Sequence, residues 1–366
     1  MAFGTRGENA ARRIMNNDKI KYRGRDMKKA NRKVAIALVV CLSVGLFAFG
    51  GCGEKAKVPA DEVTVYMPDG APALALAELM AKDTEEDGVT YRVVDASVIA
   101  TKVSGQVMDD NADFCVMPLN AASNLLGDGE KYQALGLVTQ GNMYLISKSG
   151  KGIVDLSELI GETVGVMQLA NVPGLTLKAA LNRQDVPWRE LSGGVEVSAE
   201  EVNLKAATGI DGTFSYYLAA EPLVSKTLAN EKAGFRLVGD LQALYNGADS
   251  KQVGYPQAVL VAKRSFIEEN AAWTKDFVAD VAGAAAWLQT ATADEIYNAV
   301  TSHFEDSEHK ATFSAETLGK ETIARCGIKF AYAKDSRERM DAFLAELEEI
   351  DSKKASMVDE KFYWLG

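Results

Sequence analysis

The chain has 366 residues, 47% of them hydrophobic and 25% charged, which is enough for one large core or two of ordinary size. Residues 1–51 carry 11 Lys and Arg against 3 Asp and Glu, which leaves 29 basic and 48 acidic residues in 52–366. This acidic body argues against binding to nucleic acid or to anionic lipid head groups. Two histidines, His303 and His309, and four cysteines without a CxxC pair form no metal or redox motif. We therefore expect no metal and no cofactor.

The N-terminal region has the three parts of an export signal. Four basic residues in 28–33 precede the uncharged run 34–49, which is short for a spanning helix. Gly50 and Gly51 follow it, and Cys52 comes next. This order resembles the lipobox of bacterial lipoproteins, in which the cysteine is lipidated and becomes the mature N-terminus.

One residue departs from the lipobox pattern: Phe49 stands where an aliphatic residue is usual. We predict a lipoprotein signal peptide over 1–51, with 1–26 as an upstream extension or a long basic region. Cys52 is then the lipidated residue, carrying palmitate or a similar acyl chain, and 52–61 form a polar tether. The alternative is an uncleaved signal anchor.

Short apolar runs alternate with helical runs after residue 61. The runs that predict strands are 62–68, 89–96, 112–118, 132–140 and 142–149. The runs that predict helices are 71–83, 98–110 and 120–129. Strands separated by helices of this length indicate a parallel sheet covered on both faces.

A second series of the same kind begins at residue 155. It contains a helix and strand over 155–168, a helix over 174–186, a strand at 194–198 or 200–204, a strand and helix over 210–230, and a strand over 235–241. An apolar strand returns near 255, and the chain is mostly helical from 268 onward. We therefore predict two lobes: lobe 1 from 62–145 and 256–366, and lobe 2 from 146–255.

Four stretches in this order carry a family likeness. They are "VTVYMPDGAPALALAELM", "DLSELIGETVGV", "GIDGTFSYYLAAEP" and "YPQAVLVAKRSFIEENAAWTKDFVADVAGAAAWLQ". The chain resembles substrate-binding lipoproteins of ABC importers, in the group that binds nitrate, sulfonate, taurine and thiamine-pyrimidine precursors. The resemblance implies an α/β fold of the type II periplasmic-binding-protein kind, with two lobes and a central ligand cleft. Its departure is the turn at 167–174, which lacks the Ser or Thr that is usual in the family.

Ligands of such sheets bind beyond the carboxyl ends of the strands, where helix N-termini present free N–H groups. The loops that qualify lie at 68–72, 117–123, 167–174 and 211–217, and the crossovers add 140–144 and 254–256. The candidate ligand-binding residues are Asp69, Gly70, Asn120, Asn142, Tyr144, Gln168, Asn171, Tyr216, Glu221 and Tyr255.

Each candidate also has a purely structural interpretation. Asp69 and Asn120 could be plain helix caps, and each tyrosine could be a core residue. The segment 303–309, "HFEDSEH", is expected to be an exposed loop, with metal binding as its alternative. Cys115 and Cys326 are expected to be buried thiols, and a bridge between them stays open.

None of the four loops contains Arg, and Lys178 lies a turn into its helix. This favours a neutral or weakly polar ligand, such as an aromatic heterocycle, over a sulfonate-like one.

We predict a non-enzymatic receptor that is exported and anchored by lipid to the outer face of a bacterial cytoplasmic membrane. It would deliver a small molecule to an ABC permease and its ATPase. The alternatives are a lipoprotein that presents its ligand to a sensor, and an enzyme on the same scaffold.

Overall fold

The computed structural model of the chain describes residues 59, 62–84, 88–104, 112–247 and 254–366. The predicted signal peptide and Cys52 lie outside the described residues, as does the tether apart from Pro59. Within the described ranges, none of the helices combines the length and the apolar character that a membrane span requires.

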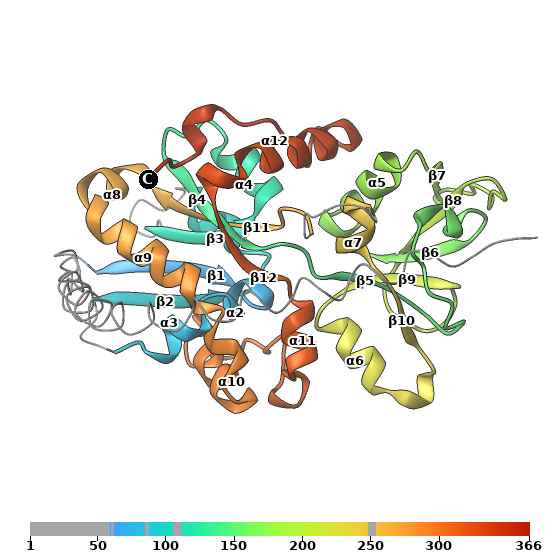
Figure 1. The fold of residues 1–366 in the computed structure, drawn as a ribbon, viewed down its shortest axis with the longest axis horizontal. Coiled ribbons are helices and arrows are strands. Elements are labelled where there is room, and N and C mark those ends of the chain that lie inside the picture. The colour runs from blue at the N-terminus through green and yellow to red at the C-terminus, as the bar shows by residue number, and fades with distance from the viewer. Residues whose placement is uncertain (1–58, 60–61, 85–87, 105–111, 248–253) are drawn as a thin grey trace, which may run out of the picture. The chain divides into compact units, whose positions relative to one another are not determined.

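The first of two sheets has the strand order β12–β4–β11–β3–β1–β2 (Figure 1). Its strands are β1 (Val63–Pro68), β2 (Val89–Val94), β3 (Phe114–Pro118), β4 (Tyr132–Thr139), β11 (Ala258–Lys263) and β12 (Ile328–Tyr332). β1 pairs in parallel with β2 and β3, whereas β11 runs antiparallel to both β3 and β4. The central strands are buried on both faces, which explains why their sequences are almost continuously apolar.

The second sheet has the order β10–β5–β9–β6–β8–β7. Its strands are β5 (Met143–Ser147), β6 (Thr163–Met167), β7 (Trp188–Glu190), β8 (Val202–Ala207), β9 (Tyr216–Ala220) and β10 (Arg236–Asp240). β6 runs parallel to β8 and β9, and β5 runs antiparallel to β9 and β10. Both sheets are therefore mixed, which corrects the expectation of a purely parallel arrangement.

Helices cover both faces of each sheet (Figure 1). Those that belong with the first sheet are α2 (Ala71–Leu74), α3 (Ala77–Ala81), α4 (Leu119–Leu126), α8 (Arg264–Glu269), α9 (Ala271–Ala284), α10 (Ala293–Thr301), α11 (Lys320–Arg325) and α12 (Ala333–Ile350). Those that belong with the second sheet are α5 (Val172–Arg183), α6 (Leu223–Ala229) and α7 (Leu241–Asn246). We call the two assemblies the first and the second lobe.

The longest helix, α12, shows how sequence spacing determines packing. Met340, Phe343, Leu344 and Leu347 recur at the i, i+3, i+4, i+7 spacing of one helix face, and all four are buried. They belong to a core cluster that also contains residues of β4, β5 and α5. One apolar core therefore continues from the first sheet to the second.

The chain passes between the sheets twice. The first crossover joins the end of β4 at Thr139 to the start of β5 at Met143, and the second joins α7 to β11. The predicted lobe boundaries, 145/146 and 255/256, lie close to these crossovers and stay a prediction. Residues 143–145 pair within the second sheet.

The predicted α/β fold is confirmed, and two strands were missed. β12 lies in a region that was predicted to be mostly helical, and β7 has only three residues. The predicted helix at 98–110 contains a 3₁₀ turn over Ile99–Lys102, and most of its remainder lies outside the described residues. Cys115 and Cys326 are both free thiols, and burial raises the pKa of each.

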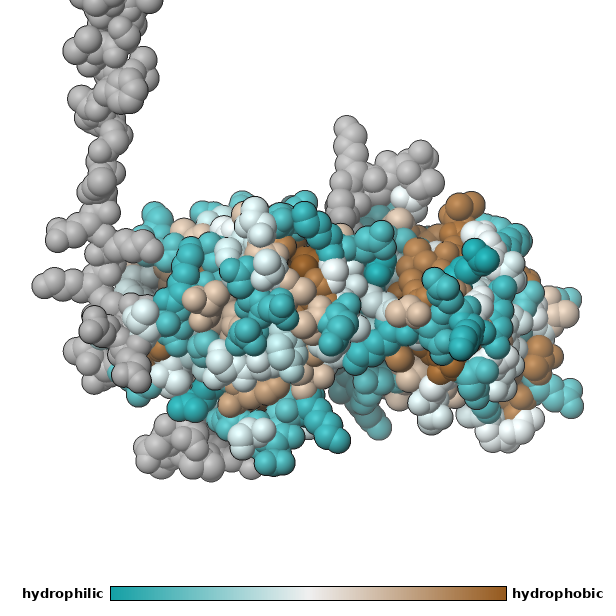
Figure 2. Space-filling view, turned by 90° about the horizontal axis from the view of Figure 1, so that it is seen from below, coloured by the Kyte–Doolittle hydropathy of each residue, from teal (hydrophilic) through white to brown (hydrophobic). Residues whose placement is uncertain are grey.

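Most of the face seen from below is hydrophilic, and its larger hydrophobic areas lie mainly over the part that holds the second sheet (Figure 2). The strongly exposed apolar side chains of the molecule include Val154 and Val197, both in loops of the second lobe.

Candidate functional site

The carboxyl ends of the parallel strands meet the two crossovers at one edge of each sheet. β1 and β3 end there in the first sheet, and β6 and β9 end there in the second. The start of β5 lies beside the end of β9, because Met143 pairs with Ala220. We call this region the interlobe edge. It is where α/β folds usually place a ligand.

Asp69 follows β1 at the interlobe edge, and its carboxylate is held by neighbouring groups. Its Oδ1 accepts from the Gly70 N–H at 2.7 Å, and its Oδ2 accepts from the Thr312 N–H at 2.7 Å. His309 Nε2 lies 3.0 Å from the same Oδ2, and only 5% of the Asp69 side chain is exposed. Asp69 therefore fixes the loop after α10 against the turn of Gly70.

The two histidines are not the plain exposed loop residues that we expected. His309 contacts Asp69, and His303 Nε2 lies 3.1 Å from Asp83 Oδ2. Both rings are largely covered, whereas the residues between them, apart from Phe304, are exposed. Among the described residues, no group of three or more His, Cys, Asp and Glu side chains is arranged to hold a metal ion.

The C-terminal segment after α12 connects two of the predicted asparagines. Asn120 Nδ2 donates to the backbone oxygen of Lys354 at 2.8 Å, and Lys354 Nζ lies 3.4 Å from Asn171 Oδ1. Asn120 is the second residue of α4. Asn171 is the N-cap residue of α5, and its side chain forms no capping hydrogen bond.

Gln168 lies in the same turn as Asn171. Its side chain is exposed, its φ is 58°, and its carbonyl accepts from the Asn171 N–H at 2.9 Å. A non-glycine residue in the left-handed region is uncommon and tends to occur where the surrounding structure needs a particular turn.

The crossovers contribute a pair of amides. Asn142 is 6% exposed and lies on the first crossover, and Gln257 lies on the second. Gln257 Nε2 donates to Asn142 Oδ1 at 2.8 Å. Gln257 Oε1 is buried and has no hydrogen-bond partner in the described part of the chain, and the same is true of Thr139 Oγ1.

Two glycines allow other backbone segments to pack directly against the first crossover. A Cβ atom at Gly254, where φ is +70°, would lie 1.8 Å from the carbonyl oxygen of Gln140. A Cβ atom at Gly327, where φ is +61°, would lie 1.9 Å from the carbonyl oxygen of Gly141. Neither position has room for a side chain.

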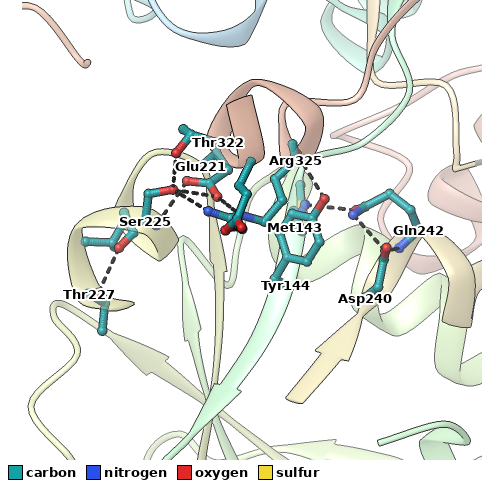
Figure 3. Close-up of polar contacts among 11 residues, drawn as sticks. Met143, Tyr144, Glu221, Ser225, Thr227, Asp240, Gln242, Thr322 and Arg325 are labelled. Atoms are coloured by element: carbon teal, nitrogen blue, oxygen red, sulfur yellow. Dashed lines mark hydrogen bonds and ion pairs between the residues drawn. The ribbon is translucent and has the colours of Figure 1, made fainter. Parts of the chain in front are cut away.

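A polar cluster joins the lobes on one side of the crossovers (Figure 3). We call it the Glu221 cluster, and it consists of Glu221, Ser225, Thr322 and Arg325. The Glu221 carboxylate is fully buried, forms an ion pair with Arg325, and accepts from Ser225 N–H at 3.1 Å and Ser225 Oγ at 2.9 Å. Ser225 Oγ also lies 2.8 Å from Thr322 Oγ1 and accepts from Arg325 Nη2 at 2.9 Å. Glu221 and Ser225 belong to the second lobe, and the other two to α11.

Tyr144 lies next to the Glu221 cluster. Its hydroxyl donates to the backbone carbonyl of Arg325 at 3.1 Å (Figure 3), and burial raises its pKa. Tyr144 also lines a cavity of about 280 Å³ together with Gln140, Asp240, Gln242, Ile323 and Gly327. This cavity has walls from both lobes. A larger one of about 630 Å³ lies elsewhere, at the start of β2 beside His303 and Asp83.

An aromatic group joins the lobes on the side of α12. We call it the aromatic seam, and it consists of Tyr245 of α7, Tyr255 of the second crossover and Phe343 of α12. The ring centroids of each pair are 5.6 to 5.9 Å apart, and all three side chains are buried. Glu346 extends the seam, because it accepts from the Tyr245 hydroxyl and pairs with Arg183 of α5.

The predicted tyrosines divide into two kinds. Tyr216 and Tyr255 are core residues, 5% and 0% exposed, whereas Tyr144 borders the interlobe cavity. The structure thus brings Asn142, Tyr144, Glu221 and Tyr255 together around the crossovers, and it connects Asn120 and Asn171 through Lys354. Asp69 and Gly70 lie in a separate, closed turn.

Sequence reasoning missed Gln257, Ser225, Arg325 and Lys354. Gln257 directly follows the "GYP" stretch, so its position beside a crossover was a signal that could have been used. Arg325 and Lys354 lie in the C-terminal helical region, far along the chain from the residues that they contact, and no local pattern indicates their role.

These features define the class of fold. Two mixed sheets of six strands, two crossovers and a C-terminal helix packed against both lobes make the chain an α/β protein with the two-lobed fold of periplasmic solute-binding proteins. The fold implied by the four quoted stretches is confirmed.

Three solved structures show what the chain is similar to. An ABC transporter protein from Parabacteroides distasonis is 19% identical with a TM-score of 0.61, and the match covers 82% of this chain and 98% of that one. The periplasmic aliphatic sulphonate-binding protein of Escherichia coli is 14% identical with a TM-score of 0.58, over 84% and 92%. The alkanesulfonate-binding protein of Xanthomonas axonopodis pv. citri bound to MOPS is 10% identical with a TM-score of 0.52, over 84% and 99%. No family model and no curated protein matches the sequence.

Proposed function

We propose that this protein is an extracytoplasmic solute-binding protein, which captures a small molecule at the interlobe edge and delivers it to an ABC importer. The observation that carries the proposal is the concentration of polar side chains from both lobes around the two crossovers. Asn142, Gln257 and the Glu221 cluster all lie there. The solved structures of similar fold include ligand-binding components of import systems, which supports the same role.

The polar contacts between the lobes support a mechanism of opening and closing. A ligand that contacts both lobes binds the closed form better than the open form, and it therefore shifts the population toward closure. The Glu221 cluster can open because water replaces its hydrogen bonds when the lobes separate. Delivery would follow when the partner permease favours the open form.

Binding is tested by a thermal-shift screen of the full-length chain in detergent against a metabolite library. A ligand present at 100 times its dissociation constant should add about 2.7 kcal/mol to the free energy of unfolding. If no compound raises the melting temperature, the proposed solute-binding role is refuted.

Lipid anchoring at Cys52 is a separate part of the proposal, supported by the basic and apolar segments that precede the cysteine. Mass analysis of the mature protein should find an acylated N-terminal cysteine. Cys52→Ser should move the protein from the membrane fraction to the soluble fraction or leave the signal peptide uncleaved. If the Cys52→Ser variant is processed to the mature form and still fractionates with the membrane, lipid anchoring at Cys52 is contradicted.

The ABC permease and its ATPase are the proposed partners. Deleting the gene for this protein should abolish uptake of the compound found in the screen, and the wild-type gene should restore it. Unchanged uptake would contradict the role in import while leaving the binding role intact.

A further inference from the structure

The two crossovers each contribute one side-chain amide to the interlobe edge. Gln257 Nε2 donates to Asn142 Oδ1 at 2.8 Å, so the two amides form a pair. The pair is held from both lobes, because Asn142 O accepts from the Glu221 N–H at 3.0 Å and Gln257 O accepts from the Leu119 N–H at 2.9 Å. The end of β9 and the start of α4 thus fix both amides.

The pair leaves hydrogen-bonding capacity unused. Gln257 Oε1 is buried and has no partner among the described residues. Exchanging the nitrogen and oxygen of both amides would keep their mutual bond. It would still leave one carbonyl oxygen and one amino group unpaired. In either orientation, the pair keeps one acceptor and one donor that their mutual hydrogen bond does not use.

A third group beside the pair is also unsatisfied. Thr139 ends β4 and is 1% exposed, and its Oγ1 has no described partner. Its backbone carbonyl accepts from the Gln257 N–H at 3.3 Å, so Thr139 and Gln257 are direct neighbours. Buried polar groups are nearly always hydrogen-bonded, so two unpaired ones at the point where the lobes join indicate a missing partner.

The charged groups described near this point bond to residues other than the amide pair. Glu221 follows β9 next to Asn142, and its carboxylate is paired with Arg325. The cation of Lys354 lies at Asn171, on the turn that precedes α5. The amide pair itself therefore offers neutral hydrogen bonds only.

The geometry points to a ligand with a neutral amide edge, which offers an N–H donor and a carbonyl acceptor next to each other, as a primary carboxamide or a lactam does. This inference rests on the proposed solute-binding function and specifies the chemical class of the solute. Gln257 and Asn142 are its specificity-determining residues. Each can form one hydrogen bond with such an edge, whereas a carboxylate or sulfonate offers acceptors only and would leave the amide carbonyl unpaired.

The test uses the full-length chain in detergent and a library that contains carboxamides, lactams, carboxylates and alkanesulfonates. Compounds that raise the melting temperature are then titrated calorimetrically. We expect the tightest ligand to carry an amide edge and to lose at least tenfold in affinity in Gln257→Met. Gln133→Met is the matched control, because Gln133 lies at the other end of β4 and bonds to Lys361 O. It should bind as the wild type does.

A second variant guards against misfolding. Gln257→Glu has nearly the same shape but no amide donor, and it should also weaken an amide ligand at least tenfold, with Gln133→Glu as its control. The inference is overturned if the tightest ligand is a carboxylate or sulfonate, or if its affinity changes less than twofold in both Gln257 variants. In that case an ordered water satisfies the unused hydrogen-bonding groups of the amide pair, and the proposed solute-binding function stands. If no compound binds the wild type, both fail.

Discussion

Two of the regions through which the lobes contact each other have opposite chemistry. The aromatic seam consists of buried rings. Water cannot replace the contacts between them, so separating the rings would expose apolar surface. The Glu221 cluster consists of charged and hydroxyl groups that water can solvate when they part. For the opening and closing that we propose, the difference predicts that the seam stays closed and that the cluster is the side that opens.

The largest effect should come from the seam. Phe343→Ala removes a ring that is 2% exposed and should lower the free energy of unfolding by about 3–5 kcal/mol, because a cavity remains. Urea denaturation measures this change. Phe343→Leu keeps most of the volume and should cost less than about 1.5 kcal/mol. A loss below about 1 kcal/mol for the alanine variant would show that the seam does not hold the lobes together.

The Glu221 cluster should respond differently. Arg325→Met leaves the buried Glu221 carboxylate without its cation and should cost about 3 kcal/mol in the closed form. Separation of the lobes would hydrate the Glu221 carboxylate, so the variant should favour the open form. Small-angle X-ray scattering should therefore show a larger radius of gyration. Arg337→Met is the control, because the ion pair of Arg337 is exposed. Glu221→Gln in the Arg325→Met background should recover much of the loss. An unchanged radius in Arg325→Met would argue against this side as the opening one.

Tyr144 tests how much a single neutral hydrogen bond adds to the cluster. Tyr144→Phe removes the bond to the Arg325 carbonyl and keeps the ring, so unfolding should become easier by about 1 kcal/mol. The double variant with Arg325→Met should lose less than the sum of the two single losses if the contacts are coupled. Strict additivity in thermal unfolding would assign Tyr144 to a separate region.

The smallest effect concerns Asp211, which lies outside both regions and gives a reference for a hydrogen bond to an exposed carboxylate. Its pKa is lowered from 3.8 to about 2, mainly by the Tyr217 hydroxyl that donates at 2.6 Å. Because the folded pKa is lowered, the stabilisation is present above pH 3.8 and is lost as the pH falls through about 2. In Tyr217→Phe, an NMR titration should find the Asp211 pKa closer to 3.8. A pKa that stays at about 2 would assign the shift instead to Thr213, whose N–H donates to Asp211 Oδ1 at 2.9 Å.

Local features of the fold could be predicted from the sequence. β1 and the turn at Asp69 and Gly70 follow from an apolar run that ends in a helix-starting motif, and α12 follows from its 3.6-residue spacing. β12 could not be found in this way. Its five residues lie between two helices, and its partner β4 is far away along the chain.

The candidate site was predictable only in part. Asn142 and Glu221 stand next to strand ends, where the fold class places ligands, and both were identified. The partners that give them a role are Gln257 and Arg325, which are 115 and 104 residues away from them. Such pairings depend on how two sheets pack, and this information is spread over the whole chain rather than contained in any local pattern.

The close backbone contacts at Gly254 and Gly327 have a consequence for engineering the protein. Each glycine faces a carbonyl oxygen of the first crossover at a distance that excludes even a methyl group. The methyl group of an alanine at either position would push its own segment away from the first crossover. We therefore expect a single small substitution at either glycine to change the resting angle between the lobes.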